Sequence, residues 1–213
     1  MRNSLTKFSR RRKRNLFVAA SVAIAFGADV VGAQPTTFDF TNDAGGDHWM
    51  RLGNWDQVNT LPTVSDVARI PSSLSNHGSH ESFFITDGTL SGNATVGTFI
   101  VNTPKVTYAG IAASDAWYVP GHTKSDATIT FGTANSAGGF VLNLDNPGEG
   151  RQFHVGSNPE NDGILNWAVP NSLAVQVASD QVLHLNVRLR GSGPVMLSRL
   201  AGSGTIDAFV FID

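Results

Sequence analysis

The sequence predicts an all-β fold, and three observations support this prediction. Apolar and polar residues alternate over short segments, a period of two that is typical of strands with one buried face. Clusters of Gly, Asn and Pro separate these segments, as turns between strands require. From about residue 94 onward, strand and turn recur every 10–12 residues. This spacing predicts an all-β sandwich, a barrel or a β-solenoid.

Residues 1–33 have the order of a cleavable secretion signal. A basic block at residues 10–14 precedes an apolar run at residues 16–26, and the small residues Val31-Gly32-Ala33 follow. The apolar run is shorter than the roughly 20 residues that a membrane-spanning helix needs. Sec-dependent export is favoured, because Lys13 stands where a twin-arginine signal prefers a bulky apolar residue. We therefore expect a secreted or cell-surface protein with no membrane span after signal cleavage; a nucleic-acid-binding arm or a retained amphipathic anchor is less favoured.

The composition of residues 34–213 excludes several classes of site and partner. These residues hold eight Lys and Arg against sixteen Asp and Glu, a net charge of −8, without a basic cluster for phosphate backbones. Nucleic acid is therefore not an expected partner. The absence of cysteine excludes disulfides, thiolate zinc sites and cysteine nucleophiles, and no cofactor is expected. Packing and backbone pairing must supply the stability.

The segment before residue 91 differs in composition from the rest. Residues 36–73 are rich in Trp, Asn and Asp, and residues 72–81 have the composition of a polar loop. We expect residues 34–90 to form a cap-like start, and residues 91–213 to form a repetitive body.

Within the body, we expect strands where every second residue is apolar. These segments are residues 96–101, 129–131, 140–144, 153–155, 165–169, 173–177 and 183–189. Helices are not expected, because no segment after the signal keeps an i, i+3, i+4, i+7 apolar pattern.

Three parts of the chain resemble large exported bacterial proteins. The sequence His-Trp-Met-Arg-Leu-Gly-Asn-Trp at residues 48–55, with Leu61-Pro62 and Asp-Val-Ala-Arg-Ile at residues 66–70, is similar to an opening that precedes a right-handed parallel β-helix. Residues 94–101 look like the first regular coil of such a body. Residues 189–206, with their Gly-Ser-Gly elements, are similar to the autotransporter-associated β-strand repeat.

The resemblance implies a segment of a right-handed parallel β-helix, as in autotransporter passengers; an antiparallel β-sandwich is the alternative. With strands about 4.8 Å apart and roughly 20–25 residues per coil, residues 94–213 would form about five coils. The Trp-rich start could cover one end of the stack, whereas no comparable capping segment is expected at the other end. The sequence departs from the repeat at Arg199, where lysine is usual, and only one such repeat is visible.

Two groups of residues are candidate metal ligands, and each has a simpler interpretation. His77, His80 and Glu81 lie among Ser, Asn and Gly, which favours a solvated loop over a metal site. Oxygen ligands also concentrate near the start, where they could bind calcium, but their spacing matches no known calcium loop and turn formation is favoured. This second group is Asp39, Asn42, Asp43, Asp47 and Asp56. We therefore predict no metal site.

Trp117 and Tyr118 are the candidate ligand-binding residues. An aromatic pair beside Pro120-Gly121 could stack on sugar rings from a loop, although core packing is the commoner role of Trp. No catalytic residues are predicted, because the sequence places no two carboxylates together for glycoside cleavage. The scattered candidates are Asp115, Asp126, Asp145, Glu149, Glu160 and Asp162.

The expected function is that of an exported structural or adhesive surface module without catalytic activity. Its partners would be polysaccharide or protein of a cell surface or matrix. The alternative is a carbohydrate-binding module or a fragment of a polysaccharide-active β-helix enzyme. A third interpretation is a shortened reading frame, because the apolar residues 208–212 would make a poor terminal cap.

Overall fold

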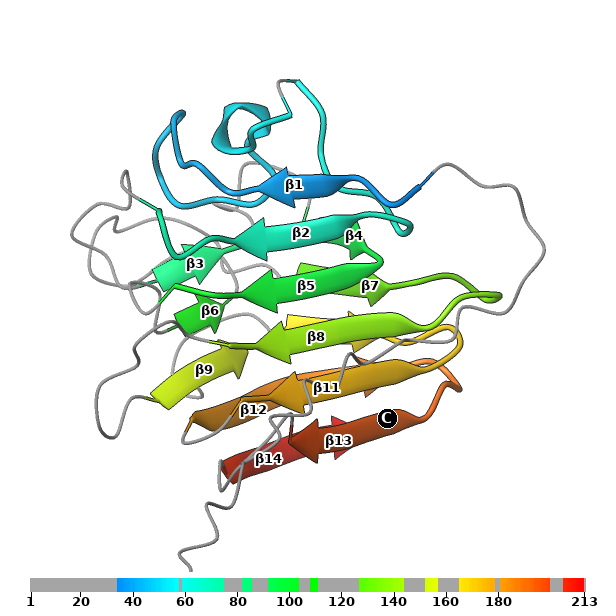
Figure 1. Ribbon diagram of the computed structural model, residues 1–213. Helices are drawn as coiled ribbons and strands as arrows, with labels where there is room; N and C mark the ends of the chain where they lie inside the picture. Colours follow the sequence, from blue (N-terminus) through cyan, green and yellow to red (C-terminus); the bar gives the residue numbers. More distant parts are fainter. Residues whose placement is uncertain are drawn as a thin grey trace, which may run out of the picture. The chain divides into compact units, whose positions relative to one another are not determined.

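Figure 1 shows the computed structural model of the protein. The structure describes residues 34–57, 59–74, 82–85, 92–103, 108–110, 127–143, 152–156, 165–178, 181–199 and 205–212. For residues 82–84, 108–110, 152, 154 and 205–212 it describes the backbone alone. The chain divides into residues 1–33 and 34–213, and the expected signal sequence lies outside the described residues.

The described part of the chain is all-β, which confirms the predicted class. It contains fourteen strands, and its only helix is the three-residue 3-10 helix η1 (Leu52–Asn54). The strands are β1 (Thr37–Asp39), β2 (Val67–Ile70), β3 (Ser82–Phe84), β4 (Asn93–Val96), β5 (Thr98–Val101), β6 (Tyr108–Gly110), β7 (Ala127–Phe131), β8 (Gly138–Leu142), β9 (Gln152–Gly156), β10 (Leu165–Ala168), β11 (Leu173–Val177), β12 (Val182–Arg190), β13 (Val195–Arg199) and β14 (Thr205–Ile212).

The strands form two sheets, and the pairing between named strands is parallel throughout. One sheet has six strands in the order β1-β2-β5-β8-β11-β13 (Figure 1). The other has eight, in the order β3-β6-β9-β12-β10-β7-β4, with β14 also paired to β12. The alternative of an antiparallel β-sandwich is therefore wrong. Among the described strands from β2 onward, none pairs with the next one along the chain, so they do not form hairpins.

Register partners in the six-stranded sheet are unevenly spaced along the chain. Val67 and Thr98 are 31 positions apart, and Thr98 and Gly139 are 41 apart, whereas Leu173 and Val195 are only 22 apart. The expected 20–25 residues per coil is correct only for the last of these steps. In the longer steps the additional residues lie in the connections between strands. The strands on either side of these connections still pair in register.

Residues 96–101, expected as one strand, contain a corner. The chain leaves β4 at Val96, turns at Gly97 and enters β5 at Thr98, so the segment contributes to both sheets. A Cβ atom on Gly97 would lie 2.9 Å from the carbonyl oxygen of Asp66. Glycine is required here because two stretches of backbone meet at the corner.

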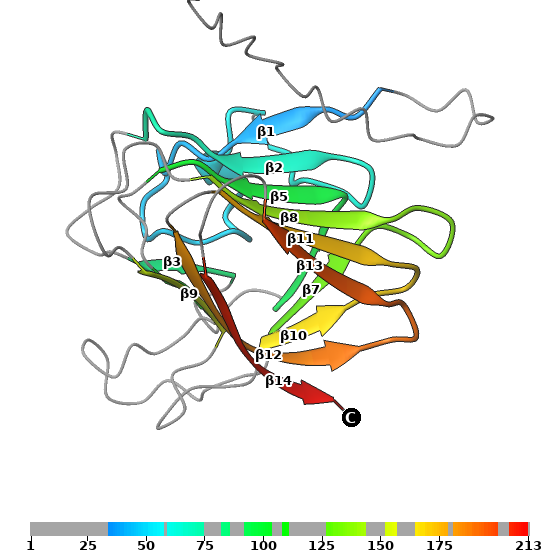
Figure 2. The same cartoon turned by 60° about the horizontal axis from the view of Figure 1, so that its bottom comes forward.

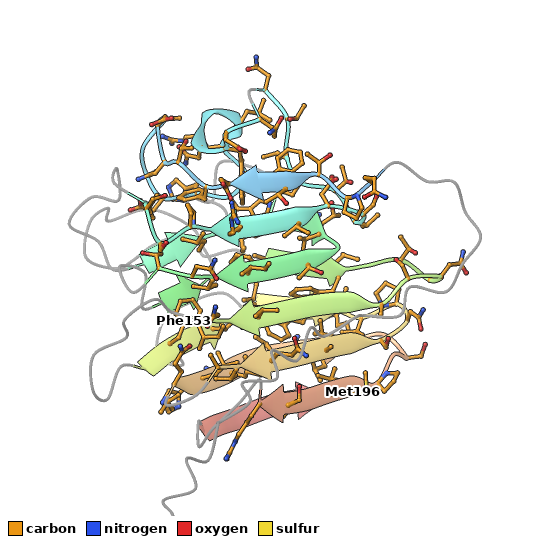
Figure 3. The ribbon with its side chains drawn as sticks, in the orientation of Figure 1. Phe153 and Met196 are labelled. Atoms are coloured by element: carbon orange, nitrogen blue, oxygen red, sulfur yellow. The ribbon has the colours of Figure 1, made fainter. Side chains whose placement is uncertain are left out.

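A series of buried aromatic rings runs through the core. Neighbouring rings in the series have centroids 5.0–5.6 Å apart, and most pairs meet edge to face, the geometry that ring quadrupoles favour. The order is Phe40, Trp55, Trp49, Phe99, Phe140, Trp167 and Phe131. Figure 3 draws these side chains and labels Phe153, another fully buried ring. Three of the four Trp therefore pack in the core.

A second glycine-dependent corner joins β12 to β13. A Cβ atom on Gly191 would lie 2.5 Å from the carbonyl oxygen of Val169, and one on Gly193 would lie 2.1 Å from that of Asn171. The Gly193 N–H donates to the Val169 carbonyl at 3.1 Å. The backbone of this corner thus packs directly against the corner between β10 and β11. Glycine is needed at both positions of the Gly-Ser-Gly element because a Cβ atom would collide with that backbone.

The two ends of the six-stranded sheet differ. At the first end, residues 40–57 cover the outer edge of β1: the Asp56 N–H donates to the Asp39 carbonyl at 2.9 Å, and Phe40 and Trp55 form an antiparallel bridge. At the other end, β13 leaves Met196 55% and Leu197 47% exposed. Figure 2 turns this end of the sheet toward the reader.

Candidate functional site

The outer surface of the six-stranded sheet is formed by two columns of residues in register, and we call it the six-stranded face. Buried residues alternate with these columns along each strand, so the columns lie on the side away from the core. One column is Thr37, Val67, Thr98, Gly139, Ala174 and Met196; the other is Asp39, Arg69, Ile100, Val141, Gln176 and Ser198. Figure 1 shows this side of the sheet.

From β5 to β13 the six-stranded face carries no charged residue. Its side chains are small or apolar and are half-buried on the central strands, with hydroxyl and amide groups at Thr98, Gln176 and Ser198. At Gly139 the surface is lowest, and a Cβ atom there would already lie 3.0 Å from the Thr98 hydroxyl. A flat partner can approach this part of the face without burying a charge, and contiguous apolar surface on a folded protein marks interaction sites.

The charged residues of the face lie at its first end and neutralise each other. The Arg69 guanidinium donates from Nε to Asp39 Oδ1 and from Nη2 to Asp39 Oδ2, both at 2.6 Å. The hydrogen bond to Asp39 raises the pKa of Arg69, and burial acts in the opposite direction. This paired arrangement ties β1 to β2 and leaves little net charge on the face.

Beside β1, a depression of about 400 Å³ brings together part of the oxygen-rich group for which turn formation was favoured over calcium binding. Asp39, Asp43 and Asp56 line it, together with Ser73. Two of these carboxylates have structural partners: Asp39 binds Arg69, and Asp56 Oδ1 accepts the Asp39 N–H at 2.9 Å.

The other two members of that group, Asn42 and Asp47, form a buried turn. Both have positive φ, 59° and 55°, a conformation that Asn and Asp tolerate better than most residues. The Asp47 N–H donates to the Asn42 side-chain oxygen at 3.0 Å, and the Asn42 amide nitrogen donates to the Asp47 carboxylate. The turn-forming interpretation accounts for these two residues.

Most other sequence-predicted site residues lie outside the described residues. This applies to the ligand-binding candidates Trp117 and Tyr118, to the metal candidates His77, His80 and Glu81, and to the carboxylates Asp115, Asp126, Asp145, Glu149, Glu160 and Asp162. Sugar binding by Trp117 and Tyr118 therefore remains a prediction. Among the side chains that the structure describes, no three His, Asp or Glu residues are grouped as metal ligands.

Sequence reasoning did not identify the six-stranded face. Alternation along residues 138–142 and 173–177 indicated which positions avoid the core, and those positions are correct. The absence of charged residues at these outward positions was the one feature of the sequence that could have indicated the face. Their union into one surface depends on pairing between strands up to 41 positions apart, which no local pattern encodes.

Comparison with known proteins gives no match: none to a protein-family model, to a curated protein or to a solved structure. The resemblance to autotransporter passengers therefore remains a prediction. In the part of the chain that the structure describes, no helix has the length and apolar character needed to cross a membrane.

Proposed function

We propose that this protein is an exported structural or adhesive module without catalytic activity, folded as a right-handed parallel β-helix. The parallel pairing, the alternation of strands between two sheets and the shared core all support this architecture. The signal-like order of residues 1–33 supports export.

The observation that carries the proposal is the uncharged part of the six-stranded face, from β5 to β13. Ile100 and Val141 are adjacent in register near its middle, and both are half-buried. A flat, mildly apolar face suits an extended polysaccharide or the surface of a matrix protein, because such partners offer contact over many strands at once. Thr98 and Gln176 add hydrogen-bonding groups that could order such a partner.

Binding of the full chain to insoluble cellulose, chitin and immobilised collagen tests the proposal. We expect saturable binding to at least one of these, and at least tenfold weaker binding for the double variant Ile100→Lys/Val141→Lys. The matched control is Thr130→Lys, which adds the same charge at a half-buried outer position of the eight-stranded sheet. Circular dichroism verifies that each variant is folded.

Three results would contradict the proposal. One is the lack of binding to all three materials, and another is equal weakening by the Thr130→Lys control. The third is hydrolase or lyase turnover of polysaccharide by the purified chain. The export component is tested separately, since the amino-terminal sequence of secreted protein should begin at Gln34.

A further inference from the structure

The last strand of the six-stranded sheet, β13, has one paired edge and one open edge. All five of its residues pair with β11, from Val195 opposite Leu173 to Arg199 opposite Val177. Among the described strands none pairs with the other edge, which Figure 2 turns toward the reader. An edge of this kind presents backbone N–H and C=O groups with which a further strand can pair. The open edge of β13 is therefore a candidate surface for strand addition.

Two columns of core residues end on β13 with side chains that are only partly buried. Leu197 follows Val175 and Phe140 in register, and these two are 0% exposed whereas Leu197 is 47% exposed. Val195 follows the buried Leu173 and is itself half-buried against the core. A strand added to β13 would cover the remaining surface of Leu197 and Val195. Its residues opposite these two positions would therefore have to be apolar.

The third core column ends in a charge. Arg199 follows the buried Val177 and Leu142 in register and is exposed. It forms no ion pair with any carboxylate that the structure describes. A neutral residue opposite Arg199 would help to bury the guanidinium group without a counter-charge, which is unfavourable. A carboxylate there would accept charge-assisted hydrogen bonds from it. The edge thus discriminates between added strands by the charge of one residue.

We propose that the open edge of β13 binds an extended peptide segment of another protein, with the pattern apolar–x–apolar–x–acidic. The apolar residues of the segment lie opposite Val195 and Leu197, and its acidic residue lies opposite Arg199. The segment runs parallel to β13, because the five pairings between strands of this sheet are all parallel. Main-chain hydrogen bonds supply affinity, and the alternate side chains supply specificity.

A second copy of this chain is a poor partner for the same edge. The strand Val195–Arg199 contains no acidic residue, so pairing two β13 edges would leave both guanidinium groups without a carboxylate. The proposed segment is also distinct from the partner of the six-stranded face. It would pair with the backbone at the edge of the sheet, whereas the face offers the outward columns from β5 to β13. The two proposals can therefore fail separately.

Fluorescence polarisation with the full chain and a labelled synthetic peptide tests the inference. The peptide Thr-Val-Thr-Leu-Thr-Asp-Thr has the required pattern, and we expect it to bind saturably, with one peptide per chain. The same peptide with Asn in place of Asp should bind at least tenfold more weakly, because Arg199 then has no charged partner. Failure of the Asp peptide to bind, or equal affinities of the two peptides, would overturn the proposal.

A charge exchange provides a gain of binding that a misfolded variant could not show. Arg199→Glu should bind the Asp peptide at least tenfold more weakly than the wild type does, and it should bind a peptide with Lys in place of Asp more tightly. The matched control is Arg190→Glu, which makes the same change at another exposed arginine near this end and should bind the Asp peptide as the wild type does. An equal loss in Arg190→Glu would contradict the proposed position of the peptide.

Hydrogen exchange of the wild type locates the bound peptide without any variant. The backbone amides of β13 should exchange more slowly when the Asp peptide is present, because strand addition gives them new partners. Protection confined to another part of the chain would overturn the proposal. Slower exchange of these amides on raising the protein concentration, without peptide, would also overturn it, because a second copy would then be the occupant.

Discussion

The two ends of the six-stranded sheet differ in how their edge strands are protected. At the β1 end, residues 40–57 bring Trp49 and Trp55 onto the core, and these side chains are 0% and 2% exposed. At the β13 end, Met196 and Leu197 are 55% and 47% exposed. A parallel stack needs some cover at each end, because an unpaired edge strand can recruit another chain. The first end has an aromatic lid, whereas β13 exposes two large apolar side chains among the described residues.

The sequence of β13 provides that protection through Arg199. Ile70, Val101, Leu142 and Val177 form a column of apolar residues that face the core, and register places Arg199 next in this column. Arg199 is exposed. A further strand added to β13 would have to bury this guanidinium group without a defined partner, at a cost of several kcal/mol. Charge on β13 thus disfavours the pairing of a further strand with this edge.

Trp49→Ala should give the largest effect, at the covered end. The substitution removes a ring that contacts both Trp55 and Phe99, with centroids 5.0 Å and 5.2 Å away, and it opens a cavity in the aromatic series. We expect the free energy of unfolding to fall by about 3–5 kcal/mol in urea titrations. Met196→Ala, at the open end, is the control and should change it by less than about 0.5 kcal/mol. Equal effects of the two substitutions would contradict the contrast between the ends.

Gly193→Ala should have the next largest effect, at the corner that leads into β13. The added Cβ atom would lie 2.1 Å from the Asn171 carbonyl oxygen, so the corner must move. We expect a loss of about 1–3 kcal/mol in the free energy of unfolding. Ser192→Ala is the matched control, because Ser192 is exposed in the same corner and should tolerate the change. A neutral Gly193→Ala would mean that the corners are not packed backbone against backbone.

Loss of the Arg69–Asp39 pair should have a smaller effect. The two side chains are 38% and 27% exposed, so water screens the pair, and we expect Arg69→Gln to cost about 0.5–1 kcal/mol. The cost should decrease in high salt, because ions screen the attraction further. Arg199→Gln serves as the comparison at the open end, where no change in stability is expected. A salt-independent loss would show that Arg69 acts through packing of its stem.

Arg199→Leu should have the smallest effect on stability but a distinct effect on association. The free energy of unfolding should stay within about 0.5 kcal/mol of the wild type, because the side chain is exposed. Sedimentation velocity should show stronger concentration-dependent association than the wild type, since the charge no longer opposes pairing at β13. Arg190→Leu, which also removes an exposed arginine near this end, should associate as the wild type does.

The strands of this fold could be predicted from the sequence, whereas their partners could not. Alternation at residues 173–177 and 183–189 identified β11 and most of β12, because burial on one face imposes a period of two. The same alternation cannot distinguish a single strand from two strands joined at a corner, and residues 96–101 were misread for that reason. It also cannot distinguish parallel from antiparallel pairing, because both bury every second residue.

The candidate surfaces were harder to predict than the strands. Ile100 and Val141 are 41 positions apart, and they become neighbours only through the pairing of β5 with β8. The six-stranded face likewise combines residues from six separate segments. The charge balance of residues 34–213 predicts an acidic body, but the uncharged surface within it is not visible from that average.

The unequal spacing of register partners has a consequence for how this protein can change. Steps of 31, 41 and 22 positions lead to equivalent pairings, so the sheets accept connections of different lengths without altering their register. Insertions and deletions between strands are therefore thermodynamically mild compared with substitutions in the core. Because the register does not depend on the length of a connection, one connection could be replaced to change recognition without disturbing the pairing of the strands.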